Sequence, residues 1–100
     1  MNLKQGNTYR LKAIINNVDI DDISKIVFKF NDIEKIYNED GTGDVTYEND
    51  NFILNFSQED TLNLENIVYY EVAVKFTDDT VKRSNIEKTS TFKTIIERVI

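Results

Sequence analysis

Alternation of apolar and polar residues runs through most of this chain and constrains its fold more than any other feature. A period of two is the signature of half-buried β-strands, whose successive side chains point to opposite faces of a sheet. The longest such run places five apolar side chains on one face: Val68, Tyr70, Val72, Val74 and Phe76. Shorter runs begin at Tyr9, Ile26, Val45 and Phe52. We therefore expect a domain built from antiparallel strands.

Turn signals separate these runs at short intervals. They are Asn16-Asn17, the segment Asn38–Asp44, Asn49–Asn51 and Asp78-Asp79. Gly41 and Gly43 are expected to supply the positive φ angles of a hairpin between a weaker strand at residues 33–37 and one at residues 45–47. A second hairpin should join the latter to residues 52–56.

Ser57, followed three residues later by Asp60, predicts a short capped helical turn. The final strand, residues 80–94, is expected to break near Asn85. About seven strands spaced in this way predict a sandwich or barrel.

Length and composition limit the classes of function. A chain of 100 residues with six Phe and five Tyr is the size of one domain with one core, so we expect a single domain over residues 1–100. It has no Cys and no His. Disulfides, zinc sites and nucleophile-His chemistry are therefore excluded, and we expect neither an enzyme nor a cofactor, metal or small-molecule substrate. The net charge of −6 disfavours nucleic acid and anionic membranes as partners, and no apolar run approaches the roughly 20 residues of a membrane span.

The spacing of Leu64, Tyr70 and Val72 resembles the tyrosine corner of immunoglobulin-like sandwiches. In that corner, a Tyr near the start of the penultimate strand donates its hydroxyl to an upstream backbone group. Tyr70, with Leu64, is the candidate. The alternative is that Tyr70 is one more buried aromatic ring. We favour the corner, and with it an immunoglobulin-like antiparallel β-sandwich of about seven strands.

The second half of the chain also resembles a family of small immunoglobulin-like proteins and domains from the structural modules of tailed phages and prophages. The resemblance rests on the segments Phe56–Leu62, Tyr69–Phe76 and Thr77–Val81. It departs from the family at Asp79, where Gly is usual, so a turn of a different type is possible there. The resemblance implies a structural or accessory component of a phage particle, in the head, tail or baseplate. Such a protein would be made in the bacterial cytoplasm and would bind other virion proteins or copies of itself.

The carboxy terminus, residues 94–100, is expected to be a short helical or extended tail. Its apolar residues recur at the spacing of one helical face: Phe92, Ile95, Ile96, Val99 and Ile100. Thr94 and Glu97 match a capping box at its start. A helix this short is marginal in water, so the tail needs a surface to pack on. Two hypotheses stay open: Ile95, Ile96, Val99 and Ile100 dock on another subunit, or the tail covers its own sandwich or extends the last strand.

Two further groups of side chains have an ordinary and a functional interpretation. One acidic turn has the oxygen ligands that calcium prefers: Glu39, Asp40, Asp44, Glu48 and Asp50. It lacks the order of a calcium loop, so we expect a solvated turn, and the same holds for Asp19, Asp21 and Asp22.

The outward residues of two strands are either ordinary cross-strand pairs or a binding face, with Tyr47 and Tyr69 as anchors. These residues are Tyr69, Glu71, Ala73, Lys75, Val27 and Lys29. That face supports the alternative function, a free-standing adhesion or recognition module for a host surface protein or glycan.

Overall fold

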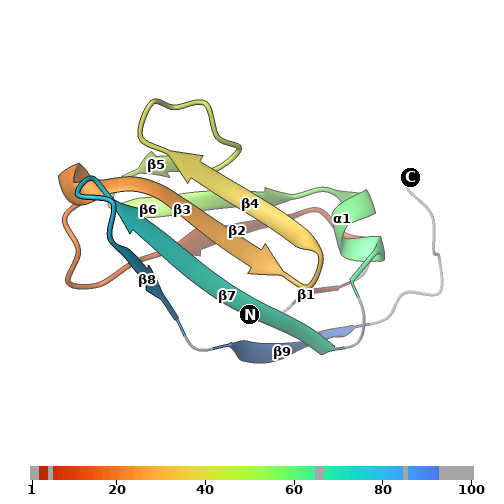
Figure 1. Cartoon of the computed structure of the whole chain (residues 1–100). Coiled ribbons are helices and arrows are strands. Elements are labelled where there is room, and N and C mark those ends of the chain that lie inside the picture. The colour runs from red at the N-terminus through yellow and green to blue at the C-terminus, as the bar shows by residue number, and fades with distance from the viewer. Residues whose placement is uncertain (1–2, 5, 65–66, 85, 93–100) are drawn as a thin grey trace.

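The computed structural model describes residues 3–4, 6–64, 67–84 and 86–92 (Figure 1). These residues form nine strands and two short helices. The strands are β1 (Leu3–Lys4), β2 (Tyr9–Ala13), β3 (Ile23–Phe30), β4 (Ile33–Asn38), β5 (Thr46–Glu48), β6 (Asn51–Phe56), β7 (Ile67–Phe76), β8 (Val81–Arg83) and β9 (Glu87–Phe92). The helices are the 3-10 turn η1 (Ile20–Asp22) and α1 (Gln58–Leu62). The strands β2 to β7 match six expected segments, and β8 and β9 together match the seventh, the interrupted last strand. β1 was not expected.

The strands form two sheets that face each other. The smaller sheet has the order β2-β6-β5, and the larger has β1-β9-β7-β3-β4, with β8 also paired to β7. All pairs are antiparallel except β1 with β9. This order is that of an immunoglobulin-like sandwich, with strands B, E and D in one layer and G, F, C and C′ in the other. The predicted fold class, an all-β immunoglobulin-like sandwich, is confirmed.

Aromatic side chains from both sheets fill the space between the layers. The centroid of the Phe52 ring on β6 lies 6.2 Å from that of the Phe28 ring on β3 and 5.1 Å from that of the Tyr37 ring on β4. The Phe56 ring lies 5.1 Å from the Phe30 ring in an edge-to-face contact. Rings at this separation stabilise a core beyond the area that they bury. The inward faces expected from the alternation are therefore the faces that pack.

One expected hairpin is wrong. β4 and β5 do not pair, because β4 belongs to the larger sheet and β5 to the smaller one. The chain between them crosses from one layer to the other. Near the end of this connection, the Val45 amide donates to the carbonyl of Ile36 in β4 at 3.0 Å. Gly41 has the expected positive φ of 80°. Gly43 is required for a different reason, since any Cβ there would overlap the Ile36 carbonyl.

The short helix α1 joins the two layers and is capped as predicted. The Ser57 hydroxyl accepts from the Asp60 amide, and the Asp60 carboxylate accepts from the Ser57 amide, both at 3.0 Å. Asp60 also binds Lys35 of β4 at 2.9 Å. In the same helix Thr61 is buried, and its hydroxyl accepts from the Gly6 amide at 3.0 Å and lies 2.8 Å from the Asn7 carbonyl. These contacts attach the chain between β1 and β2 to the far end of β6.

The last expected strand is present in two pieces. β8 pairs with the second half of β7 and β9 with its first half, so the predicted interruption is confirmed. The tail at residues 94–100, with the proposed docking residues Ile95, Ile96, Val99 and Ile100, lies outside the described residues. Neither described helix has the length and apolar character that a membrane crossing needs.

Candidate functional site

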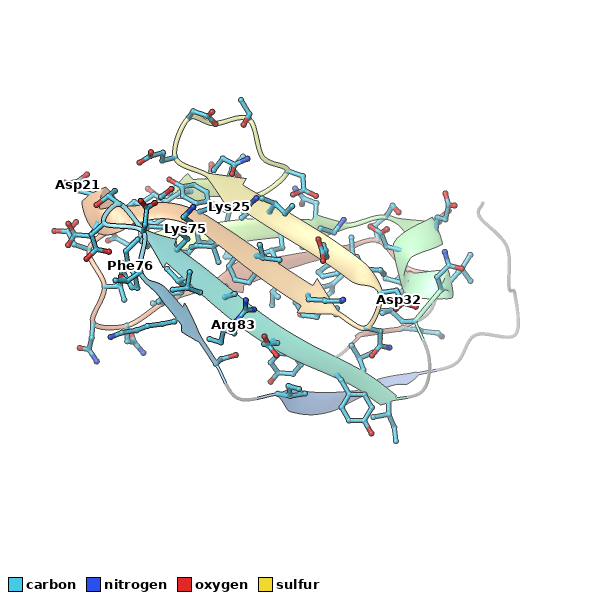
Figure 2. The ribbon with its side chains drawn as sticks, in the orientation of Figure 1. Asp21, Lys25, Asp32, Lys75, Phe76 and Arg83 are labelled. Carbon is cyan, nitrogen blue, oxygen red and sulfur yellow. The ribbon has the colours of Figure 1, made fainter. Side chains whose placement is uncertain are left out.

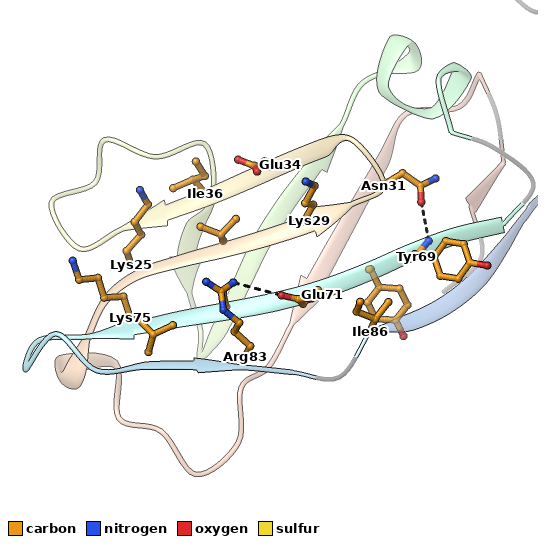
Figure 3. A pocket seen from close by; sticks show the side chains of 14 residues that line it. Lys25, Lys29, Asn31, Glu34, Ile36, Tyr69, Glu71, Lys75, Arg83 and Ile86 are labelled. Carbon is orange, nitrogen blue, oxygen red and sulfur yellow. Dashed lines mark hydrogen bonds and ion pairs between the residues drawn. The ribbon is translucent and has the colours of Figure 1, made fainter.

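The outer face of the larger sheet carries a shallow groove of about 700 Å³, formed by β3, β4, β7, β8 and Ile86 (Figure 3). We call this surface the open face. Its charged residues are Lys25, Lys29, Glu34, Glu71, Lys75 and Arg83, and its apolar residues include Val27, Ile36, Ala73, Val81 and Ile86. These are the outward positions of the alternating strands, so the same periodicity that builds the core also builds this surface.

Strand register arranges the open face in three rows that run across the strands. In the first row, Lys29 of β3 lies between Glu34 of β4 and Glu71 of β7. Cross-strand neighbours of opposite charge stabilise a sheet by a few tenths of a kcal/mol to about 1 kcal/mol. Glu71 also lies 3.6 Å from the Arg83 guanidinium (Figure 3). The charges of this row are therefore balanced within the protein.

The second row is apolar. Val27 lies between Ile36 and Ala73, and Ala73 is followed by Arg83 on β8. The groove continues to Val81, Tyr69 and Ile86, which are 50%, 53% and 67% exposed. Exposed apolar side chains that gather in one place, rather than singly, are typical of surfaces that bind other molecules.

The third row holds a pair of like charges. Lys25 of β3 lies directly opposite Lys75 of β7, with Asn38 on one side and Val81 on the other. Like charges at directly opposed positions destabilise a sheet. Lys75 lies 3.7 Å from Asp79, an exposed contact of little energetic value, and no described acidic side chain lies within ion-pair distance of Lys25. Figures 2 and 3 show both lysines on the open face. We call them the lysine pair.

The tyrosine-corner residues are Leu64, which follows α1, and Tyr70 of β7. Leu64 is buried in the core, and the half-buried Tyr70 ring stacks on Phe30 at 5.9 Å. This ring position fits both interpretations of Tyr70. Within the described residues the hydroxyl makes no hydrogen bond to upstream backbone, the contact that defines the corner. The tyrosine corner therefore stays a prediction.

The acidic turn uses several of its carboxylates for local structure. Asp40 accepts from the Thr42 hydroxyl at 2.6 Å and from its amide at 3.0 Å, and these two hydrogen bonds hold the Asp40 pKa below its ordinary value. Asp44 accepts from the Ile36 amide at 2.6 Å, and Glu48 pairs with Arg10 at 3.0 Å. No group of three or more acidic side chains among the described residues is arranged to hold a metal ion.

The structure separates the two tyrosines expected to anchor a binding sheet. Tyr69 is exposed on the open face, but Tyr47 belongs to β5 of the smaller sheet and packs on Phe52 at 4.8 Å. Tyr47 is therefore a half-buried residue that packs against the core from the smaller sheet, and pairing it with Tyr69 was wrong. Asp79 has a φ of 69°, so this residue adopts the left-handed conformation for which Gly is usual.

The alternation in the sequence predicted part of the open face but not the rest. The residues on β3 and β7 follow from alternation, whereas Ile36 and Arg83 join them through strand pairing. Ile86, which lies between β8 and β9, lines the same groove. Comparison of the chain with family models, curated proteins and solved structures finds no match. What the open face binds must therefore be argued from its own chemistry.

Proposed function

We propose that the chain is a non-enzymatic assembly domain, a structural or accessory component of a bacteriophage or prophage particle that binds other virion proteins or copies of itself. The observation that carries the assembly role is the open face, where an apolar row lies beside the lysine pair. Apolar side chains beside charges that are weakly paired within the chain, Lys75 with the exposed Asp79 and Lys25 with no described acidic side chain, suit an interface with complementary charges. The phage setting rests on the resemblance of residues 56–81 to phage structural domains.

Particle composition tests this proposal directly. Phage particles released by a bacterium that carries the gene are purified on a density gradient, and the chain is sought by mass spectrometry. We expect it in the particle fraction in stoichiometric amounts. If the chain is produced in these cells but is absent from intact particles, the proposed function is wrong.

The same preparation tests whether the open face is the surface used. Reversal of the lysine pair by Lys25→Glu and Lys75→Glu should exclude the chain from particles. The matched control reverses Arg10 and Lys12, two exposed cations on the smaller sheet, and should be incorporated normally. Equal incorporation of both variants would assign assembly to another surface.

A second candidate function is a free-standing recognition module for a host surface protein or glycan. The exposed ring of Tyr69 beside the groove favours it, because an aromatic face next to polar groups suits a sugar ring. Tyr69→Ala should then abolish binding to a glycan array or to host cells. Unchanged particle assembly in that variant, together with lost host binding, would favour this alternative.

A further inference from the structure

The charge of the open face differs from that of the rest of the molecule. Four cationic and two acidic side chains border the groove, so the face has a formal charge of +2 on a chain of −6. The remainder of the sequence therefore carries −8. A surface that is basic on an otherwise acidic protein selects an acidic partner, since complementary potentials favour the encounter and like charges oppose it.

Two open faces do not complement each other. A symmetric pair would place the lysine pair of one copy on a basic surface of the other, and charges of one sign brought together disfavour the contact. A second copy must therefore present a different part of its surface. Contacts between two different patches are heterologous, and they produce rings or open chains instead of closed dimers.

One end of the sandwich has the required character. The loop before β3 and the turn between β7 and β8 lie together there, because the Thr77 amide donates to the Asp22 carbonyl at 2.9 Å. These segments carry five exposed carboxylates, which we call the acidic end: Asp19, Asp21, Asp22, Asp78 and Asp79. Figure 2 shows Asp21 and Phe76 at this end.

The acidic end also offers apolar surface. Val18 and Phe76 line a hollow between its carboxylates, together with Lys82. The open face and the acidic end are therefore matched in kind: each has apolar side chains, bordered by lysines on one and by carboxylates on the other. Contact between them would give counter-charges to Lys25, which has no ion-pair partner among the described residues, and to Lys75, whose contact with Asp79 is exposed.

We infer that the open face of one copy binds the acidic end of a second copy, so that copies of this chain join through a heterologous contact. The inference rests on the proposed assembly function and names the partner as the chain itself. It differs from a fixed dimer because two joined copies still leave one open face and one acidic end free, on different copies. Association should be opposed by salt, which screens the charges on both surfaces.

Two charge reversals test the contact from both sides. One variant carries Lys25→Glu and Lys75→Glu, and the other carries Asp21→Lys and Asp22→Lys. The latter two side chains are exposed, and neither makes a side-chain hydrogen bond or ion pair to another described residue. The first variant replaces one like-charged pair by another and loses only the exposed contact of Lys75 with Asp79, so its fold should be retained. Circular dichroism and thermal melting check both variants.

Sedimentation velocity then measures association at low salt. The wild type should form species that grow with concentration beyond a dimer, and each variant alone should associate roughly tenfold more weakly or less. An equal mixture of the two variants should associate again, because one contact between them joins the two unchanged surfaces and the other places the introduced glutamates opposite the introduced lysines. Both variants keep a net negative charge, so general attraction does not explain recovery. The control Arg10→Glu with Lys12→Glu should associate like the wild type.

Three outcomes would overturn the inference. They are a wild type that stays monomeric at millimolar concentration and low salt, variants that associate as the wild type does, and a mixture that fails to recover. A closed dimer as the largest species would also contradict a heterologous contact. None of these results bears on whether the chain is present in phage particles, so a failure here is distinct from a failure of the proposed function.

Discussion

Thr61 is the one buried polar side chain in the described core, with 1% of its surface exposed. Its hydroxyl accepts from the Gly6 amide and lies within hydrogen-bonding distance of the Asn7 and Gln58 carbonyls. A buried donor left without a partner costs about 1–3 kcal/mol. Thr61 therefore joins α1 to the chain before β2 through a contact that sequence patterning did not indicate, because a lone Thr in a turn carries no periodic signal.

Replacement of Thr61 by Val keeps its shape and removes the hydroxyl. We expect Thr61→Val to lower the free energy of unfolding by about 1–3 kcal/mol, since the Gly6 amide loses its acceptor. Thr61→Ser, which keeps the hydroxyl, is the control and should lose less. Urea denaturation followed by circular dichroism measures both. A loss in Thr61→Val that is no larger than the loss in Thr61→Ser would contradict the role given to the hydroxyl.

Asp60 couples stability to pH. Its partial burial acts to raise its pKa, but the hydrogen bond from Lys35 and the Ser57 amide outweigh burial and hold the pKa below the ordinary value of 3.8. A carboxylate whose pKa is lowered by folding adds stability above its unfolded pKa and loses it as the pH falls through the folded value. The contribution of Asp60 should therefore be complete at neutral pH and disappear in acid below about pH 4.

Asp60→Asn tests this dependence. The variant should be less stable than the wild type at neutral pH, and the difference should shrink as the pH is lowered below 3.8. Urea denaturation across this range gives the measurement. Lys35→Met, which removes the ammonium partner at 2.9 Å, should flatten the same part of the pH profile. A difference between wild type and Asp60→Asn that is constant with pH would contradict the assignment.

At the scale of elements, alternation located the strands but not the connection between β4 and β5. The acidic turn and its two glycines are compatible with a hairpin, and they equally suit a crossing between layers. The choice depends on which edge each strand joins, a long-range property that local turn chemistry does not encode. By contrast, the Asn49 and Asp50 turn between β5 and β6 has positive φ at both residues and forms the hairpin that was expected.

Gly43 is the residue on which that crossing depends. Because a Cβ would overlap the Ile36 carbonyl, Gly43→Ala should force the loop away from β4 and lower the free energy of unfolding by about 1–3 kcal/mol. Gly41→Ala meets no atom within 4 Å and suffers only from its positive φ, so it is the matched control and should lose about 1 kcal/mol. Thermal unfolding monitored by circular dichroism compares the two. A smaller loss at Gly43 than at Gly41 would contradict this packing.

At the scale of the whole molecule, one rule of alternation produced both the core and the open face. The inward faces of β3, β6 and β7 could be predicted because burial selects large apolar residues at every second position. The open face could be predicted only in part, since its rows depend on strand order and register. The lysine pair in particular becomes visible only when Lys25 and Lys75 are placed opposite each other.

The sheets also differ in how many neighbours each strand has. β6 lies between β2 and β5, and β3 lies between β4 and β7, whereas the described residues pair β2 with β6 alone. Backbone amides bonded on both sides of a strand are released to solvent only by large-scale opening. In heavy water, the amide protons of β3, β6 and β7, which also has neighbours on both sides, should therefore be retained longest. Along β2, fast and slow deuterium uptake should alternate from one residue to the next, which marks the side of the sandwich where another strand has room to attach.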